Sequence, residues 1–369
     1  MPPLYRYPWM DKVVDAFRDE LRRHILSELA PRLHAWREQG FIPRESWRGL
    51  GEIGAILPEL PEEYGGAGAP LAYQLVLQDE LAREEIPANL AVNAIAAHYI
   101  LDYSTEAQKR YWLPRLAGGE ELAGIAMTEP GAGSDLKAMT TRARRDGDDY
   151  LLDGTKVFIT NGFTATIIVV ACRTGDASAR GISLLIVETR NLPGLSVSRL
   201  RKIGQHAADT TELSFSSVRV PCSSLLGTAE GLGFRQLMSQ LAFERLLLAV
   251  PAAATIDRAR ELNVEHSRNR KMFGGTLFDQ QNTRFRLAEA ATASHIVRGF
   301  INSCIQQLLD GTLDPQAAIW RNGGAPTSNA RSSTNASSSL AAMAIWKKAR
   351  SRVSSSIPAP SEYMAAPTR

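Results

Sequence analysis

The sequence of 369 residues has few cysteines, little net charge and no long apolar run. Its three cysteines, Cys172, Cys222 and Cys304, are odd in number and widely spaced, without a C-x-x-C pair. Cysteines in this pattern form neither a disulfide framework nor a zinc site, so we expect no metal centre and a reduced, cytoplasmic environment. The formal net charge of +3 is too small for this length to indicate a nucleic-acid-binding surface.

No apolar run approaches the roughly 20 residues that cross a bilayer. Residues 1–23 carry acidic side chains and lack the continuous apolar core of a signal peptide. We therefore expect neither membrane insertion nor a removable leader. Hydrophobic residues make up 44% of the chain and charged residues 22%, a composition typical of a globular protein with two or three domains.

The spacing of apolar residues changes twice along the chain. Within residues 11–116 they recur every four residues, as on one face of a helix. Within residues 124–221 they form short β-branched runs, such as 182–187, that are bounded by turn residues and indicate strands. Helical spacing returns within residues 231–309, so two helical segments flank a β-rich one.

This order of segments predicts an α+β fold in which helical domains flank a middle, β-barrel-like domain. Residues 325–340 are rich in Ser, Thr, Asn and Ala without periodicity, which predicts a disordered tail. The four predicted regions are an N-terminal α-helical domain at residues 1–120, a middle β domain at 121–226, an incomplete C-terminal α-helical domain at 227–318 and the tail at 319–369.

The stretch A-M-T-E-P-G-A-G-S-D at residues 126–135 resembles the signature of acyl-CoA dehydrogenases. Four further blocks resemble the same family in order and spacing, which makes the match specific although each block alone is modest evidence. They are T-E-A-Q-K at residues 105–109, G-T-K-V-F-I-T-N-G at 154–162, K-I-G, D-T and R-V-P between 202 and 221, and R-K-x-F-G at 270–274 with Gln281.

The resemblance implies that the chain binds FAD. Thr128 and Thr160 would offer hydroxyls and backbone amides to the flavin ring, and Met127 and Gly133 belong to the same set. Ser134, in the glycine-rich turn, would face a phosphate oxygen and also contact the substrate. Without the ordered blocks, a Gly-Ala-Gly-Ser stretch is usually only a turn.

Phe158 would form a flat apolar wall against the flavin, although a phenylalanine in a strand more often belongs to the core. Arg270, Phe273 and Gln281 would reach the FAD of a neighbouring subunit, with Arg270 pairing with its phosphates. That arrangement implies at least a dimer, as a homodimer, a homotetramer or a heteromer with a paralogue.

The family removes an α-proton from an acyl-CoA thioester while the β-hydride passes to the flavin, and it passes electrons to an electron-transfer flavoprotein in fatty acid metabolism. The base is a carboxylate whose pKa rises when it is shielded from water. Glu244, followed by Arg245 in F-E-R-L-L-L-A, resembles the base of the isovaleryl and long-chain branches. Arg245 would be a structural or substrate contact. The alternative is a solvated Glu-Arg pair on a helix surface.

The resemblance stops at about Ala318. The family expects two further helices with a G-G-x-G turn and a terminal G-T-x-E segment, and neither stands in residues 319–369. Codons can be chosen so that a shifted reading frame of these residues encodes similar strings, including P-G-G-Y-G and V-H-G-G-T-N. We therefore expect a frameshift between about Leu313 and Ala318, which the DNA sequence tests. An impaired, non-catalytic partner of a complete paralogue is the alternative function, and a flavoprotein oxidase on the same fold also stays open.

Overall fold

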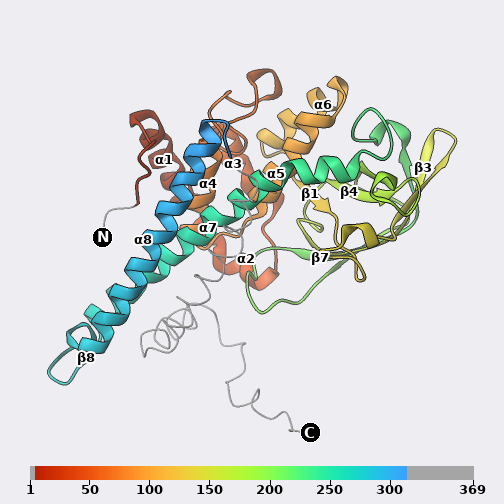
Figure 1. Ribbon diagram of the computed structural model, residues 1–369. Coiled ribbons are helices and arrows are strands. Elements are labelled where there is room, and N and C mark those ends of the chain that lie inside the picture. The colour runs from red at the N-terminus through yellow and green to blue at the C-terminus, as the bar shows by residue number, and fades with distance from the viewer. Residues whose placement is uncertain (1–4, 314–369) are drawn as a thin grey trace, which may run out of the picture.

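The computed structural model describes residues 5–313, which form three parts in chain order (Figure 1). Helices come first, a curled β-sheet follows and two long helices come last, which confirms the predicted α+β order. The first part contains α1 (Lys12–His24), α2 (Leu33–Gln39), α3 (Arg48–Glu52), α4 (Ala72–Arg83), α5 (Asn89–Tyr103) and α6 (Glu106–Ala117).

Two of these helices begin at side chains that cap them. The carboxylate of Asp11 accepts hydrogen bonds from the amides of Val13 and Val14 at 2.8 and 2.9 Å, at the start of α1. At the start of α6, the Thr105 hydroxyl accepts from the Gln108 amide, and the Gln108 side chain accepts from the Thr105 amide at 2.9 Å. This reciprocal pair is a capping box, so the T-E-A-Q-K block at residues 105–109 is the beginning of a helix.

Seven strands form one sheet in the order β1-β4-β2-β3-β7-β6, with β5 paired to β4. The two longest strands, β3 and β7, run antiparallel, and β1 runs parallel to β4. All seven residues of β4 are buried, which agrees with the continuous apolar sequence of residues 167–172. The strands are β1 (Ala123–Ala126), β2 (Arg142–Asp146), β3 (Asp149–Thr160), β4 (Ile167–Arg173), β5 (Ile182–Glu188), β6 (Leu195–Arg199) and β7 (Thr210–Pro221).

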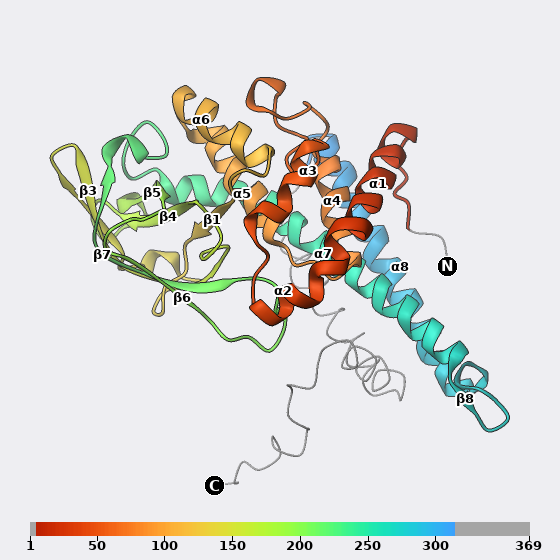
Figure 2. The ribbon, with the colours of Figure 1, turned by 180° about the vertical axis from the view of Figure 1, so that it is seen from behind.

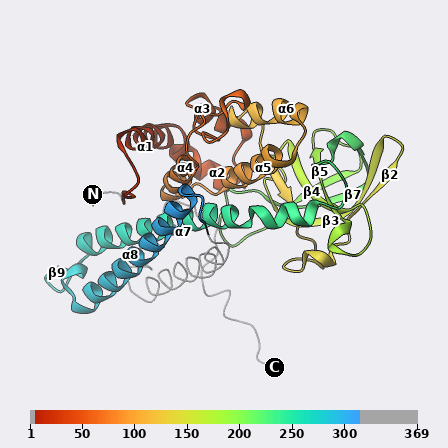
Figure 3. The same cartoon turned by 45° about the horizontal axis from the view of Figure 1, so that its top comes forward.

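The last part is a pair of long helices, α7 (Gly233–Asn269) and α8 (Gln281–Leu309), joined through strands β8 (Lys271–Met272) and β9 (Gly275–Thr276). The β8–β9 hairpin lies at the tip of this pair, at the opposite end of α7 from the sheet (Figures 2 and 3). At 1.5 Å per residue the 37 residues of α7 span about 55 Å. Side chains at the two ends of α7 therefore cannot meet within one chain.

Among residues 5–313, α7 is the one helix long and apolar enough, by length and composition, to cross a membrane. Half of its most apolar window is buried inside the protein. There α7 packs against α4, α5 and α8, as the core helix of a globular protein does. We expected no apolar run of membrane-spanning length, and α7 is an exception to that expectation by its length and composition.

A buried ionic network joins the first part of the chain to the last. Arg298 of α8 is 1% exposed. Its Nε donates to Asp257 of α7 at 2.7 Å, and its Nη1 donates to the Tyr7 hydroxyl at 2.6 Å and to Asp79 of α4. Charges withdrawn from water in this way need such partners, so the network fixes α4, α7 and α8 relative to one another.

Part of α8 presents apolar side chains to solvent. Phe285 is 59% exposed, Ile296 68% and Phe300 40%. Exposed apolar side chains along one helix are typical of a surface that contacts other protein. The predicted tail and the proposed frameshift lie outside the described residues.

Candidate active site

A buried ion pair connects the glycine-rich turn to strand β3. Lys156 is fully buried and Glu129 is 4% exposed. The Lys156 Nζ donates to Glu129 Oε1 and to the Met127 carbonyl, both at 2.9 Å, and Glu129 also accepts from Thr140 and Thr141. Burial alone would raise the pKa of Glu129, but hydrogen bonds from Lys156, Thr141 and Thr140 outweigh it and lower the pKa to about 2. The carboxylate therefore stays charged and holds the turn against the strand.

Phe158 points out of the sheet beside this turn. The Val157 amide donates to the Thr128 carbonyl at 2.9 Å, which aligns the turn with β3. The pairing of β3 with β7 shifts register between Lys156 and Ile159, and Phe158 has a φ of 62°. This left-handed conformation is unusual for a bulky residue, and the ring is 68% exposed. The alternative that Phe158 is a core residue is therefore wrong.

Three hydroxyl groups near the turn are free to bind a ligand. Thr128 and Thr160 are half-buried and Ser134 is exposed, and none of their hydroxyls has a hydrogen-bond partner within residues 5–313. A Cβ atom added at Gly133 would meet nothing within 4 Å, so open space adjoins the turn. Unpartnered hydroxyls, an exposed ring and an open glycine turn fit a flavin with its pyrophosphate, so the residues present fit FAD. Met127, half-buried, lies in the same turn.

Glu244 is a buried carboxylate in the first half of α7. The Tyr99 hydroxyl of α5 donates to its Oε1 at 2.7 Å. Burial raises the pKa of Glu244, while the hydrogen bond from Tyr99 and the charge of Arg245 act in the opposite direction. Glu244 is therefore not part of a solvated surface pair. Arg245 is half-buried and forms no ion pair with any described residue, and its predicted contact with substrate stays a prediction.

Arg270, Phe273 and Gln281 gather around the β8–β9 hairpin. Each is exposed, and Phe273 is 88% exposed with a φ of 47°. The hairpin lies at the far tip of the α7–α8 pair from the sheet, where Phe158 lies in β3 and Thr128 follows β1 (Figure 1). Within one chain these two groups do not form one site.

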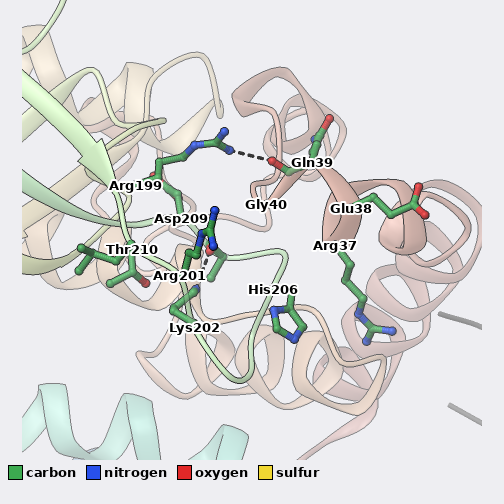
Figure 4. Close-up of a pocket in the computed structure, with 12 residues that line it drawn as sticks. Arg37, Glu38, Gln39, Gly40, Arg199, Arg201, Lys202, His206, Asp209 and Thr210 are labelled. Carbon is green, nitrogen blue, oxygen red and sulfur yellow. Dashed lines mark hydrogen bonds between the residues drawn. The ribbon is translucent and has the colours of Figure 1, made fainter. Parts of the chain in front are cut away.

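A basic pocket of about 530 Å³ lies between the end of α2 and the segment that joins β6 to β7 (Figure 4). Arg199 reaches across it and donates to the Gln39 carbonyl at 2.7 Å. Asp209, part of the predicted D-T block, is buried and accepts from the Phe163 and Thr164 amides, which gives it a structural role. None of the residues predicted to bind FAD lines this pocket. Its lining consists of Arg37, Glu38, Gln39, Gly40, Arg199, Leu200, Arg201, Lys202, His206, Ala208, Asp209 and Thr210.

Comparison with known proteins extends the motif evidence to most of the chain. Models of the acyl-CoA dehydrogenase N-terminal, middle and C-terminal domains match residues 12–120, 124–218 and 231–345. The mitochondrial long-chain specific acyl-CoA dehydrogenase of Sus scrofa is 37% identical over 315 residues, which are 83% of this chain and 73% of that protein. The chain belongs to the acyl-CoA dehydrogenase family. The C-terminal match runs past Ala318, where we expected the resemblance to stop.

Solved structures of acyl-CoA dehydrogenases share the fold. An acyl-CoA dehydrogenase from Geobacillus kaustophilus superposes with a TM-score of 0.86 at 37% identity, over 90% of this chain and 88% of that chain. A glutaryl-CoA dehydrogenase from Mycobacterium smegmatis in complex with FADH2 superposes with a TM-score of 0.81 at 27% identity, over 88% and 83% of the two chains. This acyl-CoA dehydrogenase is therefore an FAD-dependent oxidoreductase of CH–CH groups, as the motifs predict.

The structure adds residues that the motif argument did not single out. Glu129 and Lys156 stand inside two matched blocks, and an acid and a lysine at fixed motif positions could have suggested the pair. Tyr99 gave no such signal because it stands within the apolar run of α5. Within residues 5–313 no group of three or more His, Cys, Asp or Glu side chains could hold a metal ion.

Proposed function

We propose that this chain dehydrogenates an acyl-CoA thioester to the trans-2-enoyl-CoA, with Glu244 as the base that removes the α-proton. The observation that carries the proposal is the burial of Glu244 with one hydrogen-bond donor, Tyr99. Burial raises the pKa of the Glu244 carboxyl, and a stronger base suits the weakly acidic α-hydrogen of a thioester.

The residues around the turn would hold the cofactor in this reaction. Bound FAD would accept the hydride from the β-carbon of the substrate. Thr128 and Thr160 would donate to its ring, Ser134 would donate to a phosphate, and Phe158 would cover one face. Their free hydroxyls and exposed ring support these roles.

We propose a long or branched acyl chain as the substrate and an electron-transfer flavoprotein as the acceptor. The place of Glu244 before Arg245 and the 37% identity to a long-chain specific enzyme support the acyl chain. The acceptor rests on the family resemblance alone. The predicted cytoplasmic location rests on the three widely spaced cysteines, a pattern typical of a reducing environment.

We also propose an oligomer in which Arg270, Phe273 and Gln281 contact the FAD of a neighbouring subunit. Their exposure at the tip of a long arm, together with the exposed apolar side chains of α8, supports a second subunit here. A homodimer or homotetramer fits these observations.

Visible absorption of the purified protein tests the proposal. We expect an oxidised-flavin band that bleaches on anaerobic addition of one member of a panel of straight and branched acyl-CoAs. Glu244→Gln should retain the band and bind the same thioester without bleaching. If Glu244→Gln bleaches at the wild-type rate, Glu244 is not the base.

The second candidate is a non-catalytic subunit that stabilises a complete paralogue. The observation that favours it is the exposed apolar surface of α8, which a paralogue could cover. In that case the chain alone would be colourless and would take up no added FAD, while co-expression would yield a heteromer that contains FAD. A flavin band that an acyl-CoA bleaches in the isolated chain would exclude this candidate.

A further inference from the structure

The Tyr99 hydroxyl has two acceptors on α7. It lies 2.7 Å from Glu244 Oε1 and 3.4 Å from the Leu237 carbonyl oxygen. Tyr99 is completely buried, so no water competes for its hydrogen. A phenol has a single hydrogen and can donate to only one of the two oxygens at a time.

The position of Tyr99 is fixed by the packing of α5 against α7. Four residues further along α5, the Tyr103 hydroxyl is 2.5 Å from the Ser239 hydroxyl. Next to this contact, the Gln240 side chain of α7 donates to Asp102 of α5. Both contacts lie on the same two helices beside the bond between Tyr99 and Glu244 and would remain if that bond were lost.

We propose that Tyr99 is a positioning residue that orients the Glu244 carboxylate and changes its own hydrogen-bond acceptor when Glu244 takes up a proton. While Glu244 is ionised, Tyr99 donates to Oε1. When the α-proton of the substrate has moved to Glu244, the carboxyl O–H donates to the Tyr99 oxygen, and the phenol hydrogen turns to the Leu237 carbonyl. Each proton stays on its own group after the transfer. The inference rests on the function proposed above.

The charges around Glu244 agree with a donor role for Tyr99. Burial, followed by the charge of Glu244 and the hydrogen bond to it, raises the pKa of Tyr99 far above its usual range, so the phenol stays protonated. Arg245, on the same helix, is a charged group that also lowers the pKa of Glu244. Since Tyr99 and Arg245 both favour the ionised carboxylate, removing the Tyr99 hydroxyl should raise the pKa of Glu244 further.

The test compares Tyr99→Phe with Tyr103→Phe as a matched control on the same helix. With the flavin-loaded enzyme and the thioester that bleaches it, Tyr99→Phe should move the acid limb of the kcat/KM profile upward by about one pH unit. It should lower kcat at pH 7 by about tenfold, with little change in KM. Tyr103→Phe should follow the wild-type profile. A Tyr99→Phe profile that overlays that of the wild type would overturn the proposal.

An infrared titration of the carboxyl band gives a readout that does not depend on turnover. The band of Glu244 is assigned by its loss in Glu244→Gln, and Tyr99→Phe should protonate Glu244 at higher pH than the wild type does. If Glu244→Gln abolishes bleaching but Tyr99→Phe leaves the titration unchanged, the role of Tyr99 is wrong and the base assignment stands. If Glu244→Gln bleaches at the wild-type rate, Glu244 is not the base, and the role proposed for Tyr99 is wrong with it.

Discussion

Replacing Lys156 by methionine tests whether the buried ion pair supports the flavin-binding turn. Methionine keeps an apolar stem of similar length and removes the ammonium group, so the hydrogen bonds to Met127 and Glu129 are lost. Glu129, which is 4% exposed, would keep a buried charge that, among residues 5–313, only Thr140 and Thr141 still contact through hydrogen bonds. Removing one member of a buried pair costs about 3–5 kcal/mol, and we expect the free energy of unfolding to fall by this amount.

Urea unfolding at pH 7 of four variants measures this loss. Lys12→Met, at an exposed lysine, is the control and should stay within about 0.5 kcal/mol of the wild type. Glu129→Gln with Lys156→Met should cost less than the sum of the two single changes, by about 1 kcal/mol or more, because neither charge is then left alone. A Lys156→Met protein as stable as the control, or strictly additive single changes, would refute the argument.

The same pair predicts how stability changes in acid. The pKa of Glu129 is about 2 in the folded protein, below its unfolded value of about 4.5, so the unfolded state binds more protons between these values. Its contribution is complete above about pH 4.5 and is lost as the pH falls towards 2. In Lys156→Met the pKa of Glu129 should rise, so that unfolding in acid begins at higher pH than in the wild type.

Three further predictions concern single side chains. Glu244→Gln should lower kcat/KM by about 10²–10⁴-fold. In the wild type, the acid limb of the pH profile should lie above the usual glutamate range because burial raises the pKa of Glu244. Steady-state rates across a pH series measure both effects. Phe158→Ala should weaken FAD binding in a fluorescence titration yet change the free energy of unfolding by less than about 0.5 kcal/mol, since the ring is exposed; unchanged affinity would contradict its role. Thr105→Ala should lose about 1 kcal/mol of unfolding free energy in urea by removing the α6 cap, while Thr105→Ser should lose little, and equal stability of both would argue against the cap.

Local patterns were enough to predict the order of elements. The four-residue recurrence of Leu21, Ile25 and Leu29 places these side chains on one buried face, each at most 1% exposed. The apolar runs of β4 and β5 are strands, because continuous β-branched sequence suits a buried sheet. Elements of this kind are determined by residues close in sequence, so periodicity reveals them.

Contacts between distant residues could not be predicted in the same way. The bond between Tyr99 and Glu244 joins positions 145 residues apart, and no local spacing encodes it. Phe158 has a strand-like sequence environment, and only the register shift between β3 and β7 turns its ring outward. The motif blocks identified which residues matter, while the partner of each depends on the folded arrangement.

The buried network around Arg298 has a consequence for synthesis of the chain. Arg298 contacts Tyr7 across 291 residues, and it also neutralises Asp79 and Asp257, which leave the ribosome earlier. Until Arg298 of α8 emerges, Asp257 lacks its ion-pair partner and Asp79 has its weaker pair with Arg18, at 3.5 Å, so the helices that carry them cannot reach their final packing. Nascent chains that end before α8 would keep an open interior and would be substrates for chaperones and proteases, which makes α8 a late checkpoint in the maturation of the protein.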